Sequence, residues 1–462
     1  MAKAKERGMD SARIAGLLAA ERELFATRNP RSRELAKRAS RHWLQGVPMH
    51  WMADWGLPFP LFTREAKGNR VWDVDGHEHI DFCLGDTGAM FGHTPAPVVR
   101  ALQEQAARGL TTMLPAEDAG VVGELLAARF GLPHWQVTAT ATDANRSVLR
   151  WARGITGRPK VLVFNGCYHG AVDDTFTALQ NGRQRPRPGL VGEVHDLDAS
   201  TVTVELNDLP ALEIALAKGD VACVLAEPVM TNCAMVLPEP GYHPELRRLT
   251  RAAGTLLVID ETHTISSSPS GYTGSHGLEP DFFVLGKPIA GGVPAGVYGW
   301  TDAVDARIAR LLAAKEPGYS GIGTTLSGSA LQLHCMRAVL EHILTEATYA
   351  PALVLAERLE SGLAALIDRH QLPWHAVRVG LRAEVVASPQ RPRHGAEASL
   401  VAHAEIEHAL HLYCLNRGIL ITPFHNMLLV CPDTTGADIE RLLAVLHEGI
   451  CELTRPTGGR AS

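Results

Sequence analysis

The sequence predicts an α/β protein with a mainly parallel sheet. Short apolar runs alternate with helical patterns between about residues 96 and 300, which is typical of a parallel sheet covered by helices. The runs expected to form strands are 161–164, 221–226, 256–259, 282–285 and 297–300. Two of these runs lead to charged residues, Asp260 and Lys287. Because open α/β sheets bind ligands at the carboxyl ends of their strands, this edge is the expected site.

The regions on either side predict a second, smaller α+β domain. Residues 10–45 have helical periodicity, and 70–77 alternates apolar and polar residues up to an Asp-Gly pair, which is a hairpin pattern. After a helical stretch over about 326–367, the pattern predicts strands at 383–387 and 427–430 and helices at 401–416 and 437–453. The expected domains are an N-terminal arm with part of the small domain (1–80), a large domain (81–330) and a C-terminal small domain (331–462).

Composition excludes several classes of partner. The 462 residues are 46% hydrophobic, and 44 basic against 50 acidic residues give a net charge of -6 without long runs of one sign. This balance argues against nucleic acid or an anionic membrane as a partner. No stretch approaches the ~20 apolar residues of a membrane span, and the basic N-terminus lacks the apolar region of a signal peptide. Eight cysteines without CxxC spacing indicate reduced thiols in a cytoplasmic protein. The tail from Arg455 is expected to be frayed.

Lys287 and Asp260 together predict the chemistry. A lysine at a strand end can form a Schiff base with an aldehyde, and a buried carboxylate can hold a protonated pyridine nitrogen. The Gly291-Gly292 pair beyond the lysine suits a close approach of backbone to ligand. Both partners are what pyridoxal phosphate (PLP) requires. Each residue alone also has an ordinary interpretation. Lys287 can be a solvated strand end, and Asp260 can be a helix cap.

Two further segments fit a cofactor site. Small hydroxyl residues over 138–145 precede a helical pattern, and a helix N-terminus of this kind can hold a phosphate, although a capped surface helix fits equally well. Tyr168 follows the run 161–164 and can lie on a planar ring, or it can be a half-buried turn residue.

Other common site types lack support in the sequence. His403, His408 and His411 lie on one predicted helix, but neither HExxH nor paired cysteines accompany them, so no metal site is expected. The fingerprints GxGxxG after a strand, GxxxxGK[ST] and GxSxG do not occur, which argues against dinucleotide dehydrogenases, P-loop NTPases and serine hydrolases.

In this order, the motifs resemble those of class III (ω-type) aminotransferases of PLP fold type I. That group includes glutamate-1-semialdehyde aminomutase, β-amino-acid aminotransferases and ω-amine transaminases. The resemblance runs from about residue 45 to the end, and its segments are 72–76, 168–170, 227–228, 260–261, 280–281, 286–292 and 325–328. It implies a mainly parallel seven-stranded sheet in a large PLP-binding domain, beside a smaller α+β domain.

The resemblance also implies residue roles. Lys287 would form the internal aldimine and then move the proton between the substrate carbon and the cofactor. Asp260 would pair with the pyridine nitrogen. The other implied cofactor contacts are Ala141 and Thr142 at the phosphate, Tyr168 on the ring, His169, Glu227 and Thr262 around it, and Thr325 across the interface of a homodimer with shared active sites.

Two departures from the family pattern affect the cofactor side. Ala141 stands where the family has a glycine, so it is strained if that position needs a positive φ and harmless if it only needs a small side chain. Thr262 stands where the family has a valine under the ring. Its hydroxyl can reach the cofactor's O3′ or simply fill the space.

The substrate side departs further. The arginines that bind substrate carboxylate in amino-acid-specific members would fall at Trp51 and near His425. Because bidentate carboxylate recognition favours arginine, an apolar or aromatic pocket that includes Trp51, Trp55 and Met90 is expected instead. A dimer interface also explains these side chains.

The expected function is a PLP-dependent transaminase that acts on a small-molecule amine and a keto acid, ketone or aldehyde. The alternative is an aminomutase, epimerase or lyase of the same family. A non-enzymatic binding module with the same fold is a third interpretation, against which an intact Lys287 and Asp260 argue.

Overall fold

The computed structural model describes residues 9–192 and 196–455. Its contacts divide the chain into two compact units. Unit 1 comprises 1–95, 350–391 and 401–462, and unit 2 comprises 96–349 and 392–400. The boundaries expected from the sequence lay after residues 80 and 330. Two expectations fall outside the described residues. One is the absence of a signal peptide at the basic N-terminus, and the other is a frayed tail beyond Arg455.

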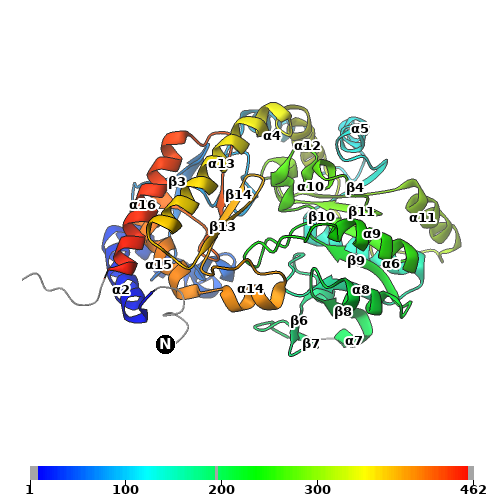
Figure 1. Cartoon of the computed structure of the whole chain (residues 1–462). Helices are drawn as coiled ribbons and strands as arrows, with labels where there is room; N and C mark the ends of the chain where they lie inside the picture. The colour runs from blue at the N-terminus through cyan, green and yellow to red at the C-terminus, as the bar shows by residue number, and fades with distance from the viewer. Residues whose placement is uncertain (1–8, 193–195, 456–462) are drawn as a thin grey trace, which may run out of the picture. The chain divides into compact units, whose positions relative to one another are not determined.

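Unit 2 is built on a seven-stranded sheet (Figure 1). Its strands in spatial order are β4 (His134–Thr138), β12 (Gly296–Trp300), β11 (Phe282–Leu285), β10 (Leu256–Asp260), β9 (Val221–Ala226), β5 (Lys160–Phe164) and β8 (Thr201–Val204). The pairs from β11 to β8 are parallel, and β12 is antiparallel to both neighbours. The predicted mainly parallel α/β fold is therefore confirmed.

Helices cover both faces of this sheet. α6 (Ala141–Thr156) and α11 (Asp302–Ala314) pack on one face, and α8 (Leu209–Leu216) and α9 (Tyr242–Ala253) pack on the other. Each face of the sheet packs against its helices in a hydrophobic core. The strands contribute to both cores because alternate side chains point to opposite faces. Along β5, Val161 and Val163 join the first core, while Leu162 and Phe164 join the second. This explains why the central strands are apolar without interruption.

The remaining elements of unit 2 lie around this layer. They are α4 (Ala96–Ala106), α5 (Asp118–Phe130), η3 (Asp173–Thr175), the hairpin β6 (Thr177–Gln180) and β7 (Arg183–Pro186), α7 (Leu197–Ser200), η4 (Thr264–Ser267), α10 (Gly271–Ser275), η5 (Lys287–Ala290) and α12 (Ala330–His342). Two helices cross the boundary between the units, α13 (Glu346–Arg369) and α14 (Gly395–Val401). The long helical stretch expected over 326–367 is thus two helices.

Unit 1 contains two small sheets and several helices. One sheet has the order β1 (Thr63–Lys67), β2 (Arg70–Asp73), β3 (Glu78–Asp81), β15 (Ile419–Leu420), and the other β13 (His375–Val379), β14 (Arg382–Val386), β16 (Leu428–Leu429). Its helical elements include α2 (Ser11–Arg28), α3 (Pro30–Ala39), η1 (Leu44–Gly46), η2 (His50–Ala53), α15 (Ala404–Leu415) and α16 (Gly436–Thr454). The N-terminal helical region breaks before Pro30, which begins α3 because proline favours the first helical position.

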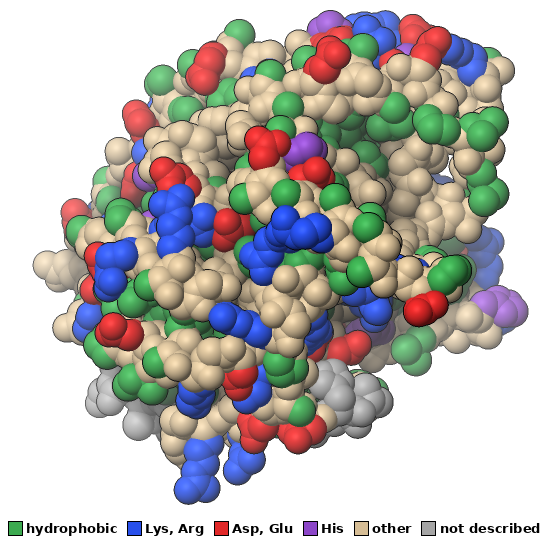
Figure 2. Space-filling view, turned by 90° about the vertical axis from the view of Figure 1, so that its right-hand side faces the viewer, with side chains coloured by type: hydrophobic (Ala, Val, Ile, Leu, Met, Phe, Trp, Pro, Cys, Tyr) green, Lys and Arg blue, Asp and Glu red, His purple; other side chains and the backbone are tan. Residues whose placement is uncertain are grey.

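Charged side chains of both signs lie on the surface of the protein. On the face drawn in Figure 2, acidic and basic side chains are interspersed. Within 9–192 and 196–455, no helix is long and apolar enough to cross a membrane.

Candidate active site

Asp260 lies at the carboxyl end of β10 and is buried. Its Oδ2 accepts a hydrogen bond from Asn145 Nδ2 at 2.9 Å and lies 2.9 Å from His169 Nδ1, while its Oδ1 accepts from the Thr262 N–H at 3.1 Å. Burial alone would raise the pKa of this carboxyl, but the hydrogen bond and charge of His169 outweigh burial and lower it to about 2. Asp260 is therefore an anion at neutral pH.

His169 completes the charged pair. Burial opposes its protonation, but Cys167 and the Asp260 carboxylate raise its pKa to about 10. Two polar atoms next to this pair are buried and have no hydrogen-bond partner within the described part of the chain, His169 Nε2 and Thr262 Oγ1. Buried polar atoms in native proteins rarely lack a hydrogen-bond partner. Both atoms therefore fit a site in which a bound cofactor supplies the missing hydrogen bonds.

Lys287 follows β11, the strand that pairs with β10. It is the first residue of η5 and has a positive φ of 46°, which is an uncommon backbone conformation for a lysine. Its Nζ lies 3.0 Å from Nε2 of His263, a buried residue three positions after Asp260. The sequence reasoning missed His263, because a histidine just past a strand end has no distinctive pattern.

The N-terminus of α6 lies against the strand that precedes Lys287. Thr140 caps the helix by accepting a hydrogen bond from the Asp143 N–H, and Ala141 is its first residue. Ala141 does not have a positive φ, so alanine is accommodated without strain. A Cβ on Gly286 would lie 2.6 Å from the Ala141 Cβ, which is why both positions are small. The helix therefore offers its N–H groups at this edge of the sheet.

A second close approach involves Thr142 and the 168–170 turn. Thr142 Oγ1 accepts a hydrogen bond from the Ala171 N–H at 3.2 Å. A Cβ on Gly170, where φ is +80°, would lie 2.1 Å from that oxygen. The glycine is thus required both by its conformation and by the space around it.

Tyr168 and Glu227 lie beside this turn. Tyr168 is 42% exposed, so much of its ring is uncovered. Its N–H donates to Glu227 Oε1 at 3.4 Å, and Glu227 Oε2 accepts from the hydroxyl and N–H of Thr231. Burial raises the pKa of Glu227.

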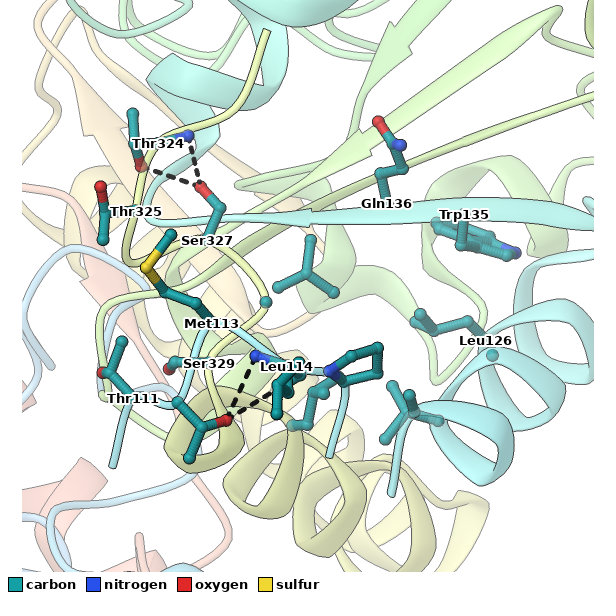
Figure 3. Close-up of a pocket in the computed structure, with 18 residues that line it drawn as sticks. Thr111, Met113, Leu114, Leu126, Trp135, Gln136, Thr324, Thr325, Ser327 and Ser329 are labelled. Carbon is teal, nitrogen blue, oxygen red and sulfur yellow. Dashed lines mark hydrogen bonds between the residues drawn. The ribbon is translucent and has the colours of Figure 1, made fainter. Parts of the chain in front are cut away.

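Thr325 lies elsewhere in unit 2. It is exposed and lines a cavity of about 480 Å³, formed mainly by 111–115 and 324–329. Figure 3 shows Thr325 and Met113 on one side of this cavity, with Trp135 on the opposite side. Lys287, Asp260 and Tyr168 do not line it. Within one chain, Thr325 is therefore not part of the cluster around Lys287.

The four candidate substrate residues all belong to unit 1. Trp51 is 48% exposed on η2, Met90 is fully buried, and the Trp55 ring packs edge-on against His411 at 5.6 Å. His425 Nδ1 lies 3.6 Å from Oε1 of Glu384, a completely buried carboxylate on β14. Burial alone would lower the pKa of His425, but the charge of Glu384 raises it.

The histidines of α15 have separate structural roles. His403 caps the helix by accepting from the Ile406 N–H, and Nδ1 of His411 lies 2.9 Å from the Ile421 carbonyl. Burial lowers the pKa of His411 to about 4, so it is neutral.

Comparisons with known proteins define the family. The sequence matches the model of the aminotransferase class-III family over residues 51–447. Glutamate-1-semialdehyde 2,1-aminomutase 1 of Bacillus cereus (strain G9842) is 33% identical over 401 residues, 85% of this chain and 92% of that protein. A crystal structure of a glutamate-1-semialdehyde-aminomutase from Pseudomonas aeruginosa PAO1 has a TM-score of 0.95 and 50% identity, covering 96% of this chain and 100% of that chain.

A more distant structure supports the fold alone. The β-phenylalanine aminotransferase from Variovorax paradoxus has a TM-score of 0.83 at 24% identity and covers 95% of this chain and 97% of its own. The chain belongs to the class III aminotransferase family. It is a PLP-dependent enzyme of fold type I, which confirms the predicted family, fold and cofactor.

Proposed function

We propose that this enzyme is a transaminase that moves an amino group between an apolar or aromatic amine, or an amino acid, and a carbonyl acceptor. The observation that carries the proposal is the placement of Lys287 and Asp260 at the ends of two paired strands, each beside a histidine. When bound, PLP supplies an aldehyde that captures amines and a ring that withdraws electrons from the substrate carbon.

In this proposal Lys287 moves the proton. Its amine accepts the proton from the substrate carbon and returns it during transfer, a task for a flexible amine at a strand end. His263 acts as a positioning residue, because its Nε2 lies 3.0 Å from Lys287 Nζ and holds the amine in one orientation. The positive φ of Lys287 falls at the first residue of the short η5, which Gly291 ends.

Asp260 keeps the pyridine nitrogen protonated. A carboxylate with a pKa of about 2 stays charged at any working pH and favours a proton on a neighbouring ring nitrogen. His169 and Asn145 hold Oδ2 and thereby fix the orientation of the carboxylate. The unpaired hydroxyl of Thr262 supports a role at the cofactor's O3′ more than simple space filling.

The phosphate would bind at the N-terminus of α6, with N–H groups of Ala141 and Thr142 as donors. Thr325 would complete this site from a second copy of the chain in a homodimer. The exposed apolar side chains near Thr325 support such an interface, since Met113 is 81%, Leu114 72% and Leu326 59% exposed.

The proposed substrate preference rests on the aromatic side chains of Trp51 and Trp55 and on the surroundings of His425, whereas Met90 is fully buried. Neither position expected for a carboxylate-binding arginine carries one. His425 lies 3.6 Å from Glu384, whose charge raises the pKa of the imidazole. The negative charge of Glu384 opposes the approach of a substrate carboxylate to this position, which favours amines with apolar or aromatic groups.

The cysteines support a cytoplasmic location. All eight lie within the described residues and are thiols, and six are buried. Such thiols persist in reducing compartments.

A donor scan tests the proposed function. The holoenzyme is mixed with aromatic amines, β-amino acids or α-amino acids, without any acceptor, and the visible absorption of the cofactor is followed. We expect aromatic amines to bleach the band, and a keto acid or aldehyde to restore it. A strong preference for amino acids would contradict the interpretation of Trp51 and His425.

The curated relatives favour a second candidate. Proteins named as glutamate-1-semialdehyde aminomutases match at 33% and 50% identity over most of both chains. An aminomutase moves the amino group within one molecule. Like an epimerase or a lyase, it needs no separate amino-group acceptor. Consumption of glutamate-1-semialdehyde at a steady rate without added keto acid would favour the mutase. A requirement for an acceptor would favour the transaminase.

A further inference from the structure

Unit 1 contains a cluster of metal-ligating side chains that the proposed reaction does not use. His370, His447 and Cys451 each offer one ligand atom, and these three atoms lie within 4.8 Å of one another. All three residues are half-buried, so an ion and a water molecule can reach them from solvent. Of the described residues, no other group of three histidine, cysteine or carboxylate side chains meets this condition.

Two helices that run in the same direction bring the cluster together. The contacts between α13 and α16 advance along both helices: Arg358 pairs with Glu440, Gly362 faces Leu443, and His370 meets His447. Figure 1 shows the two helices side by side. His370 directly follows the last residue of α13, and its N–H still donates to the Leu366 carbonyl. The end of the helix therefore fixes its position.

His447 and Cys451 lie on one face of α16. They are four residues apart, so their side chains are neighbours on the helix surface. His447 Nδ1 lies 2.7 Å from His370 Nε2 and 3.9 Å from Cys451 Sγ. Zinc bonds of about 2.0–2.1 Å to nitrogen and about 2.3 Å to sulfur place such atoms about 3.3 Å and about 3.6 Å apart on a tetrahedral ion. Small side-chain rotations bring all three atoms to these separations.

The ligand atoms are also in a suitable chemical state. A nitrogen–nitrogen distance of 2.7 Å requires one ring to donate an N–H to the bare nitrogen of the other. Two imidazoles with one thiolate form a set that zinc favours over magnesium or calcium.

We propose that His370, His447 and Cys451 bind one Zn²⁺, with a water molecule as the fourth ligand. On binding, the Cys451 thiol releases its proton to solvent, and the proton between the two imidazoles moves to another ring nitrogen. The ion would join the end of α13 to α16 within unit 1. This site is independent of the proposed transaminase function, since no residue of the cofactor cluster takes part.

Metal analysis of the holoenzyme tests the site. The protein is incubated with one equivalent of Zn²⁺, passed through a desalting column, and its zinc is measured. We expect one zinc per chain in the wild type and in Cys233→Ser, a control at the other half-buried cysteine, and loss of this zinc in Cys451→Ser and His447→Gln. Equal zinc in the wild type and in Cys451→Ser would overturn the proposal.

Cobalt provides an independent readout. Co²⁺ bound to a thiolate gives a near-ultraviolet charge-transfer band that Co²⁺ on imidazoles or carboxylates lacks. We expect this band in the wild type and in Cys233→Ser, but not in Cys451→Ser, with the cofactor absorption unchanged in all three. A wild type without the band would show that the cluster is only a hydrogen-bonded histidine pair beside a thiol.

Discussion

At the scale of single residues, Asp260 and Lys287 each lie beside a histidine. Asp260 and Lys287 could be found from the sequence because each follows an uninterrupted apolar run. His169 came only from the family resemblance. His263 was not found at all, because its contact with Lys287 depends on the pairing of β10 with β11. Residues that act through a neighbour across a sheet leave no pattern in the sequence.

His263→Leu tests the role of the Lys287 contact. A typical hydrogen bond contributes about 0.5–1.5 kcal/mol, so the rate of proton transfer should fall roughly 2- to 13-fold. Cofactor affinity should change little, and His263→Gln should recover part of the rate. The deuterium isotope effect on single-turnover bleaching with α-deuterated amine should rise in His263→Leu. An unchanged rate and isotope effect would show that His263 only fills space.

The Asp260–His169 pair predicts a pH dependence of stability. The pKa of His169 is raised from 6.5 to about 10 in the folded protein. Its contribution is therefore complete below pH 6.5 and is lost as the pH rises towards 10. Between these values, the unfolding free energy of cofactor-depleted wild type should fall by up to about 1.4 kcal/mol per pH unit relative to His169→Asn.

Denaturant unfolding of both proteins between pH 7 and 9 checks this sign. A difference that stays constant over the range would mean that His169 is neutral in the folded state. A difference that grows with pH would contradict the charged pair outright.

At the scale of elements, the proposed cofactor site lies where α6, β11 and the 168–170 turn approach one another. Each approach needs a small residue, because a Cβ at Gly286 would meet Ala141 and one at Gly170 would meet Thr142. Because Gly286 has no Cβ and Ala141 does not have a positive φ, the Ala141 side chain is accommodated at the N-terminus of α6. The sequence raised that question but could not answer it, since the answer depends on packing between distant segments.

Gly170→Ala should weaken cofactor binding. The added Cβ would lie 2.1 Å from Thr142 Oγ1 and push the first turn of α6 out of place. Gly131→Ala is the matched control, because φ is +74° there but a Cβ meets nothing within 4 Å. Both variants should lose about 1 kcal/mol or more of stability to backbone strain. Only Gly170→Ala should raise the Kd for PLP, by roughly tenfold or more; equal Kd values would refute the role of this contact.

The edges of the sheet show where prediction from sequence ends. β9, β10 and β11 are buried on both faces and were predicted from their apolar runs. β4 and β8 form the two edges and include polar residues, so their runs were not recognised. Nor does a short apolar run show its direction, and the antiparallel placement of β12 became clear only from its pairing.

At the scale of the whole molecule, the central question is whether one chain suffices. Thr325 does not line the cluster around Lys287 but an exposed cavity with apolar side chains around it. A second copy that covers this surface explains both the exposed side chains and the position of Thr325. The sequence alone predicted this only through the family resemblance.

Met113→Asp combined with Leu326→Asp should disrupt the proposed homodimer. Charges on these exposed apolar positions would be buried in the interface, at a cost of several kcal/mol. Sedimentation should then show monomers, and the affinity for PLP should fall because Thr325 no longer reaches the phosphate. Ile214→Asp, at another exposed apolar position of unit 2, should remain dimeric. A wild type that binds PLP fully as a monomer would contradict the shared site.

Covalent mapping of the cofactor tests the central claim most directly. Borohydride makes the bond between a lysine amine and the aldehyde carbon of PLP permanent, and peptide mass spectrometry then identifies the modified lysine. We predict a single labelled peptide that carries the cofactor on Lys287, and no label when an amine donor has first bleached the band. Label on another lysine, or on Lys287 equally before and after the donor, would contradict the assignment of Lys287 as the residue that binds the cofactor and releases it to substrate.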